Sequence, residues 1–267
     1  CLVAGMEEKM KQYPTIRSLY MSFYSKSFYK DVARNWNSTG FLYLFLLVLL
    51  CIIPMMFSFQ EAVSAFVADE APRIVRQVPE VKITKGKISI DKPMPYIIND
   101  PDKGLPLIII DTTGKITSLD GSPATILITE SKIVMEKSSV ETRTFNLSEI
   151  DNFYLDRSMV YKFLDIISDW LTVLVFPFAL IFSFLCRILQ VLLYSVFGLL
   201  FAHILKTGIN YKTLVRLTAI SITPAVIFGT VRDYLHISVP YWSWISFLIA
   251  MSYLFFALKV SSEKETA

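Results

Sequence analysis

The sequence is poor in the residues that build disulfides and metal sites. It has 3 cysteines, and none lies within residues 61–168, so that segment holds neither a disulfide nor a cysteine-based zinc site. Its 2 histidines, His203 and His236, are too few for a multi-histidine metal centre. The chain also lacks the GxSxG, HExxH, GxGxxG and P-loop signatures. These absences predict a protein that is not an enzyme and binds no cofactor.

Charge is scarce and unevenly spread. Charged residues make up 18% of the chain and apolar ones 54%, whereas soluble domains have about 25% and about 45–50%. Residues 41–60 carry no charge, while residues 61–168 carry 13 basic and 16 acidic groups. The pattern excludes a disordered chain, a coiled coil and an ordinary soluble domain. It predicts a polytopic α-helical membrane protein with one soluble insert. Because the insert carries more acidic than basic groups, we do not expect it to bind nucleic acid.

The composition divides the chain into five segments. We expect a basic N-terminal segment over residues 1–40, a first span over 41–60 and an α+β insert over 61–168. A membrane bundle over 169–260 and a polar tail over 261–267 follow. The first segment has six Lys/Arg against three Asp/Glu, which predicts a cytoplasmic N-terminus and an extracytoplasmic insert. An exported domain without disulfides favours a bacterial cytoplasmic membrane. We expect Cys1 to be a trimmed start, with Met6 as the initiator, rather than a lipid-modified N-terminus.

Residues 14–38 have the periodicity of one amphipathic helix. Aromatic and apolar side chains recur every four residues on one stripe, and cations form a second stripe at Lys26, Lys30 and Arg34. One interpretation places the helix on an anionic membrane surface, with these cations and Trp36 among the lipid headgroups. The other packs the helix against the protein's own membrane domain. The sequence leaves both open.

The apolar run over residues 170–205 decides the number of spans. It is interrupted only by Arg187 and Gln190, and as one helix it would reach about 54 Å against a hydrocarbon core of about 30 Å. We therefore expect two spans that meet near Arg187, and five in total, with the others over 41–60, 214–235 and 240–260. Five spans place Lys206, Lys212 and Arg216 outside the cytoplasm, against the positive-inside rule, whereas four spans would place these cations inside.

The insert alternates between apolar and polar residues from residue 81 onward, after a helical exit over 61–80. Gly86 marks a hairpin turn, and Asn146 is a polar cap that predicts the start of a helix running toward Trp170. Strands are expected over 81–84, 88–91, 107–111, 125–129, 132–136 and 142–145. We expect the strands within 81–90, 107–111 and 125–136 to form one sheet in an α+β domain of about 100 residues, which is enough for its own core.

Polar residues at membrane depth are the strongest functional signal in the sequence. Because a charge at mid-bilayer costs about 3 kcal/mol, such residues usually face a bundle interior or an aqueous path. The candidates are Arg187, Gln190, His203, Arg232 and Asp233. For Arg187, a place in a tight turn between two spans is the competing interpretation, and the five-span topology requires it.

The order of features resembles a bacterial membrane-protein family known as domain of unknown function 1189, some members of which are labelled maltodextrin-utilisation proteins. The resemblance rests on SLYMSFYSK (18–26), Ala33-Arg34, IDTTG (110–114), YKTLVRLTAISITP (211–224) and FALK (256–259). It covers nearly the whole chain, although Asn35-Trp36-Asn37 departs from the aromatic-basic-Gln-Gly run expected there. IDTTG also approaches an aspartic-protease motif, but its extra Thr and the absence of a second copy favour a strand ending in a turn. The resemblance implies an architecture and no activity.

Two hypotheses about function follow. The first is a non-catalytic accessory or scaffold protein whose extracytoplasmic domain contacts another membrane or extracytoplasmic protein. The alternative is a transporter or permease component with a polar path along Arg187, Gln190 and His203. The alternative requires these three side chains to face one water-filled cavity.

Overall fold

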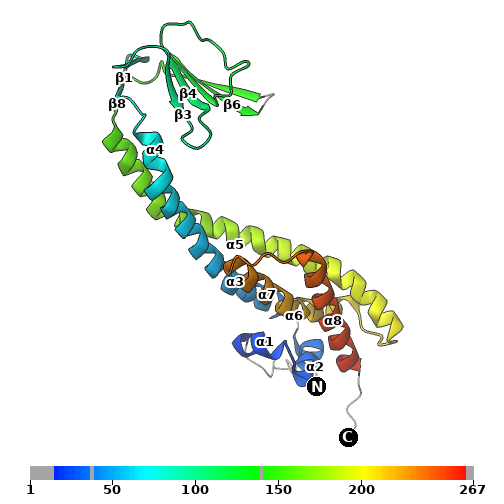
Figure 1. The fold of residues 1–267 in the computed structure, drawn as a ribbon. Helices are drawn as coiled ribbons and strands as arrows, with labels where there is room; N and C mark the ends of the chain where they lie inside the picture. Colours follow the sequence, from blue (N-terminus) through cyan, green and yellow to red (C-terminus); the bar gives the residue numbers. More distant parts are fainter. Residues whose placement is uncertain (1–14, 37–38, 139–140, 263–267) are drawn as a thin grey trace, which may run out of the picture. The chain divides into compact units, whose positions relative to one another are not determined.

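The computed structural model describes residues 15–36, 39–138 and 141–262 (Figure 1). The chain divides into two compact units: Cys1–Phe59 with Val173–Ala267, called here the membrane unit, and Gln60–Thr172, called the insert unit. The expectations for Cys1, Met6 and the end of the tail, residues 263–267, lie outside the described residues.

Four helical stretches of the described chain are long and apolar enough to cross a membrane. They are Gly40–Val75, Arg157–Ile204, Tyr211–Tyr234 and Trp242–Ser262. Together with a separate unit that contains β-sheets, they give the architecture of a membrane protein with an α+β domain.

The expectation of two spans within 170–205 is wrong, because α5 (Arg157–Ile204) is one continuous helix of 48 residues. The segment from Ser183 to Gln190 contains no Gly, Pro or Asn that could end a helix. Pro177 lies inside the helix without interrupting it, as membrane helices tolerate. Arg187 therefore lies within a helix and not in a turn.

The core of the membrane unit is centred on α6 (Tyr211–Ser221), which buries seven residues. Around it pack α3 (Thr39–Ala65), α5, α7 (Thr223–Tyr234) and α8 (Trp242–Ser262). A hydrogen bond of 2.7 Å joins the hydroxyls of Tyr43 and Thr223, which links α3 to α7. A Cβ atom on Gly198 of α5 would lie 3.2 Å from Leu214 and 3.3 Å from Leu254. The missing side chain thus lets α5 pack closely against α6 and α8.

The N-terminal segment forms two short helices and not the single one expected over 14–38. They are α1 (Thr15–Met21) and α2 (Lys26–Asn35). Ser25 is the N-cap of α2, because its hydroxyl accepts a hydrogen bond of 3.3 Å from the Phe28 N–H. The aromatic stripe is divided as well: Phe28 is fully buried, whereas Tyr20 and Tyr24 on the other side of the break are exposed.

The insert unit contains two sheets. Its helical entry continues from α3 through η1 (Phe66–Glu70) into α4 (Ala71–Val75), where Pro72 lies in the first turn. The strands are β1 (Val81–Thr84), β2 (Lys87–Ile90), β3 (Tyr96–Asn99), β4 (Pro106–Asp111), β5 (Ile126–Thr129), β6 (Lys132–Ser138), β7 (Glu141–Asn146) and β8 (Asn152–Leu155). One sheet has the order β2-β1-β8 and the other β3-β4-β5-β6-β7, in which only β4 and β5 pair in parallel.

Two expectations for the insert are wrong. The strands form two sheets and not one, because β1 pairs with β8, a strand that the sequence analysis did not predict. Asn146 does not start a helix but ends β7. The segment after it is held by tertiary contacts: Leu147 is buried, and the Ile150 carbonyl accepts a hydrogen bond of 2.9 Å from the Gly86 N–H. These contacts outweigh the local capping preference.

Candidate functional site

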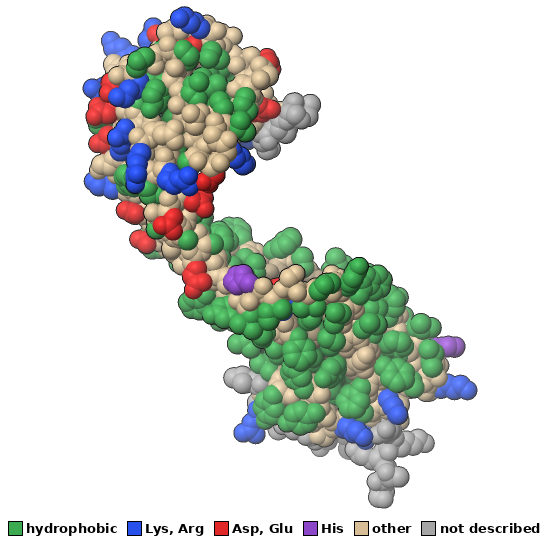
Figure 2. Space-filling model, viewed as in Figure 1, with side chains coloured by type: hydrophobic (Ala, Val, Ile, Leu, Met, Phe, Trp, Pro, Cys, Tyr) green, Lys and Arg blue, Asp and Glu red, His purple; other side chains and the backbone are tan. Residues whose placement is uncertain are grey.

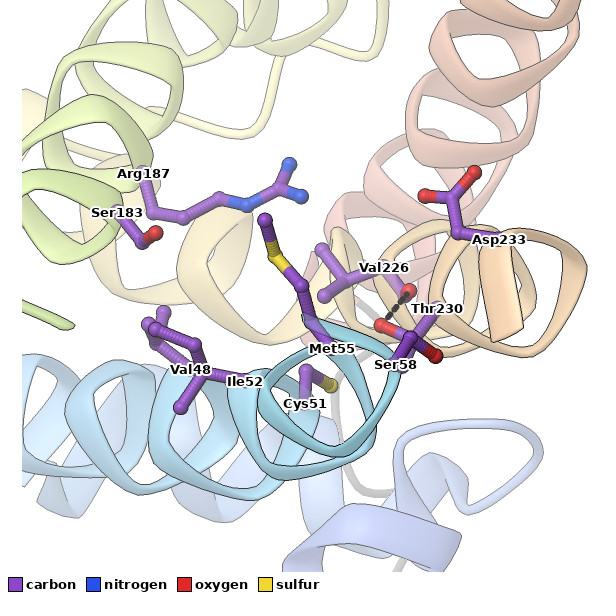
Figure 3. Close-up of a pocket in the computed structure, with 10 residues that line it drawn as sticks. All are labelled: Val48, Cys51, Ile52, Met55, Ser58, Ser183, Arg187, Val226, Thr230 and Asp233. Atoms are coloured by element: carbon purple, nitrogen blue, oxygen red, sulfur yellow. Dashed lines mark hydrogen bonds between the residues drawn. The ribbon is translucent and has the colours of Figure 1, made fainter. Parts of the chain in front are cut away.

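A polar cavity in the membrane unit lies among α3, α5 and α7 (Figure 3). Its volume is about 190 Å³. The lining residues are Val48, Cys51, Ile52, Met55, Ser58, Ser183, Arg187, Val226, Thr230 and Asp233. A cavity with hydroxyls and charges of both signs is unusual within apolar helices, where polar groups face protein or water rather than lipid.

Arg187 reaches into this cavity from α5, and its guanidinium points across the space toward α7 (Figure 3). Its Nη1 donates a hydrogen bond of 2.5 Å to Oε1 of Gln190, three residues further along the same helix face. Gln190 therefore orients Arg187. The spacing of these two residues, noted in the sequence, is the local feature that positions the charge.

Asp233 lies across the cavity, near the end of α7, next to a cation and an aromatic ring. Arg232 forms an ion pair with Oδ1 of Asp233, to which its Nε donates at 3.0 Å. The Arg232 guanidinium lies 4.8 Å from the centre of the Trp242 ring, a cation–π distance. The side chain of Arg232 is 23% exposed and that of Asp233 is 67% exposed. Arg232 is thus fixed, and the Asp233 carboxylate stays open.

The five predicted intramembrane residues do not form one site. The cavity brings Arg187 and Asp233 together, and Gln190 and Arg232 contact them. His203 lies elsewhere, in a separate and more open pocket that it shares with Lys206. The hydroxyl residues Ser58, Ser183 and Thr230 could not be identified from the sequence, because single hydroxyls in apolar helices are common and have no recognisable spacing.

The four residues expected at the membrane surface separate into two groups. Lys26 and Arg34 are exposed and Lys30 is half-buried, whereas Trp36 is fully buried, so its expected surface position is wrong. The Trp36 indole N–H donates a hydrogen bond of 2.9 Å to Oδ2 of Asp31, and its ring packs edge-on against Phe28. Satisfying the N–H internally allows the whole ring to be buried.

The helix α2 packs against the protein itself. Arg216 of α6 donates a hydrogen bond of 2.7 Å to the Trp36 carbonyl, and Ser261 of α8 donates one of 3.4 Å to the Tyr29 carbonyl. The Tyr29 ring lies edge-on to Phe256, with 5.7 Å between ring centroids. Of the two interpretations left open by the sequence, these contacts favour packing on the membrane unit for the aromatic stripe of α2.

In the insert unit, Asp111 of the IDTTG segment is tied into its own loop. Its Oδ1 accepts hydrogen bonds from the Thr113 hydroxyl at 2.6 Å and the Thr113 N–H at 2.9 Å, and Oδ2 accepts one of 2.6 Å from the Ile116 N–H. These bonds hold the pKa of Asp111 below its usual range. The carboxylate is fully buried. Its geometry is that of a structural residue that closes the loop after β4.

The insert unit also exposes one edge of each sheet. All six side chains of β7, the last strand of the five-stranded sheet, are exposed. Phe145 on β7 is 50% exposed, and Phe153 on the edge strand β8 is 48% exposed. Acidic and basic side chains are mixed over the visible face of this unit, whereas apolar side chains cover the visible face of the membrane unit (Figure 2). Within the described chain, no group of three or more His, Cys, Asp or Glu residues could hold a metal ion.

Comparison with known proteins confirms the resemblance seen in the sequence. The family model described as "Protein of unknown function (DUF1189)" matches residues 16–258. The chain is also similar to "Uncharacterized protein RP489" of Rickettsia prowazekii (strain Madrid E), with 26% identity over 230 residues, which cover 77% of this chain and 79% of that protein. No solved structure gives a significant match.

Proposed function

The chain belongs to the DUF1189 family, whose function is unknown, and we propose that it is a non-catalytic scaffold protein of the bacterial cytoplasmic membrane. In this proposal the insert unit lies outside the cytoplasm and contacts a partner protein. Asp111, the residue nearest to a catalytic motif, supports a non-catalytic function, because both of its oxygens accept hydrogen bonds from its own loop. A general acid or base would need a carboxyl group within reach of a substrate.

The observation that carries the proposal is the exposed edge strand β7. Among the described strands it pairs only with β6, so the backbone groups on its other side face outward. Such an edge can accept an added strand from another chain, with main-chain hydrogen bonds supplying affinity. Phe145 on the same strand is half exposed and can supply an aromatic anchor of the kind that dominates protein interfaces.

The charge of the insert favours a protein as the partner. Residues 61–168 carry 13 basic and 16 acidic groups, which gives neither the basic surface that nucleic acid requires nor one that anionic lipid attracts. A mixed polar surface with a few exposed aromatic residues is typical of transient protein–protein contacts.

Photo-crosslinking in intact bacterial membranes tests the proposal. A benzophenone amino acid is placed at Phe145, and the matched control carries it at Lys103, an exposed residue in the turn between β3 and β4. We expect an adduct with a different protein from Phe145 and none from Lys103, and the same protein should copurify with the wild-type chain in mild detergent. Recovery of the chain alone under every condition, or equal adducts from both positions, would refute the proposal.

The transporter alternative receives less support from the geometry. It requires Arg187, Gln190 and His203 to face one cavity, yet His203 and Lys206 line a different pocket. Arg187 and His203 are 16 residues apart on α5, about 24 Å along the helix. The structure thus offers a local polar cavity rather than a continuous path along these residues.

A further inference from the structure

The cavity of the membrane unit contains two opposite charges that do not neutralise each other. Arg187 enters from α5 and Asp233 from α7, but no salt bridge joins them in the described part of the chain. Arg187 bonds to Gln190, and Asp233 bonds to Arg232 through Oδ1. The ion pair with Arg232 is made through Oδ1 alone, and the Asp233 carboxylate lies across the cavity from the Arg187 guanidinium (Figure 3).

Arg187 is half-buried in an apolar helix, where a charge needs polar partners, whereas the Asp233 side chain is 67% exposed and open to a ligand. A ligand that carries an anion at one end and a cation at the other would satisfy both. The anion would lie at Arg187 and the cation at Asp233. Ser183, which lines the cavity on the same helix as Arg187, can donate a hydrogen bond to the anionic end (Figure 3).

The size and the surroundings of the cavity narrow the ligand class. A volume of about 190 Å³ lies below the range of about 300–1,000 Å³ typical of sites for drug-sized molecules. Apolar residues such as Ile52 and Val226 complete its walls. Each of the three helices lies in a helical stretch long and apolar enough to span a membrane, and α7 does so together with α6 as Tyr211–Tyr234. Lipid headgroups are therefore the small charged groups in closest supply.

We propose that the cavity binds a zwitterionic phosphate–ammonium group, as in phosphatidylethanolamine, with the phosphate at Arg187 and the ammonium at Asp233. Arginine forms charge-assisted hydrogen bonds with phosphate, and a primary ammonium donates hydrogen bonds to a carboxylate. A choline group has no N–H to donate, and a phosphatidylglycerol headgroup has no cation. The site should therefore prefer phosphatidylethanolamine over phosphatidylcholine and phosphatidylglycerol.

Native mass spectrometry of the purified full chain in detergent tests the preference, with the three lipids in matched acyl chains. Because one lost hydrogen bond to a charged group corresponds to about a tenfold change in affinity, we expect Arg187→Gln to weaken both phosphatidylethanolamine and phosphatidylglycerol about tenfold. Asp233→Asn should weaken phosphatidylethanolamine by a similar factor and leave phosphatidylglycerol unchanged. The control Lys206→Gln, a charge change in the separate pocket, should alter neither.

Soluble glycerophosphoethanolamine distinguishes the two sources of the headgroup. If it displaces the lipid at comparable concentration, the ligand is a soluble zwitterion; if it does not, the ligand is the membrane lipid, and either result supports the headgroup chemistry. Equal binding of all three lipids by the wild-type chain would overturn the proposal, as would equal effects of Arg187→Gln and Lys206→Gln. If Arg187→Gln does not fold, Asp233→Asn still decides the question. If this variant loses as much affinity for phosphatidylglycerol as for phosphatidylethanolamine, the ammonium group does not lie at Asp233.

Discussion

The β1–β2 hairpin offers a sharp test of the insert fold, because one glycine in it meets two independent constraints. Lys85 and Gly86 have φ angles of 51° and 77°, the left-handed values of a two-residue type I′ turn. A Cβ atom on Gly86 would lie 2.9 Å from the Ser148 Cα and 3.0 Å from the Leu147 carbonyl oxygen. Both are backbone atoms, which no side-chain rotation can move away.

Replacement of Gly86 by Ala should therefore destabilise the insert by two additive effects. The left-handed conformation costs an alanine about 1–2 kcal/mol, and the collision adds about 1–3 kcal/mol. We expect a total of about 3 kcal/mol, which corresponds to roughly a hundredfold change in the unfolding equilibrium. The matched control is Gly104→Ala, because Gly104 has a φ of 67° but nothing within 4 Å of its added Cβ. Gly104→Ala should therefore lose stability only through the cost of the left-handed conformation and not through a collision.

Hydrogen exchange of the β5 amides in the full-length chain measures this difference. Leu127 on β5 is fully buried, so its amide exchanges only when the insert opens. Exchange in Gly86→Ala should be at least about tenfold faster than in Gly104→Ala. Equal rates in the two variants would show that the segment after β7 does not cover the hairpin turn, and the packing described here would be refuted.

Three further predictions address other parts of the molecule. Because hydrogen bonds lower the pKa of Asp111 in the folded state, the stability of the insert against urea should fall as the pH drops below about 4. At neutral pH the Asp111→Asn variant should be about 1–3 kcal/mol less stable than the wild type, and its stability should fall less as the pH is lowered. Asp31→Ala removes an acceptor of the Trp36 indole and should destabilise the packing of α2 by about 1–3 kcal/mol, seen as faster amide exchange in α2; unchanged exchange would contradict the burial argument. A membrane-impermeant thiol reagent should label Lys103→Cys in intact cells and Lys206→Cys only after lysis, and the reverse would overturn the orientation.

Much of the strand pattern in the insert could be predicted from the sequence. The hairpin at Gly86 and the strands near 107–111 and 132–136 follow from period-two alternation and turn residues, and the structure confirms them. These signals are local. The pairing of β1 with β8 joins strands about 70 residues apart, and nothing in their alternation specifies the partner.

The candidate site could be predicted only in part. Arg187 and Asp233 stand out as charges in apolar segments, but their meeting depends on how α5 packs beside α7. The apolar length of 170–205 suggested two spans, because about 54 Å exceeds the membrane core. A rule about length carries no information on where a helix ends, and the segment around Arg187 lacks the residues that end one.

Because α5 is one continuous helix, it also bears on the number of membrane crossings, for which the apolar length of 170–205 favours five and the positive-inside rule favours four. If each of the four candidate helical stretches crosses the membrane once, both ends of the described chain would lie on the same side, together with Lys206, Lys212 and Arg216. The contacts agree with this arrangement: Arg216 in the middle of α6 donates to the Trp36 carbonyl, and Ser261 at the end of α8 donates to the Tyr29 carbonyl. The end of α8 therefore lies beside α2, near the N-terminal side of the described chain. Four crossings therefore satisfy the positive-inside rule that five crossings violate. The apolar excess of α5 must then be covered by lipid along a tilted or bent helix, because none of its most apolar window is buried by the protein itself.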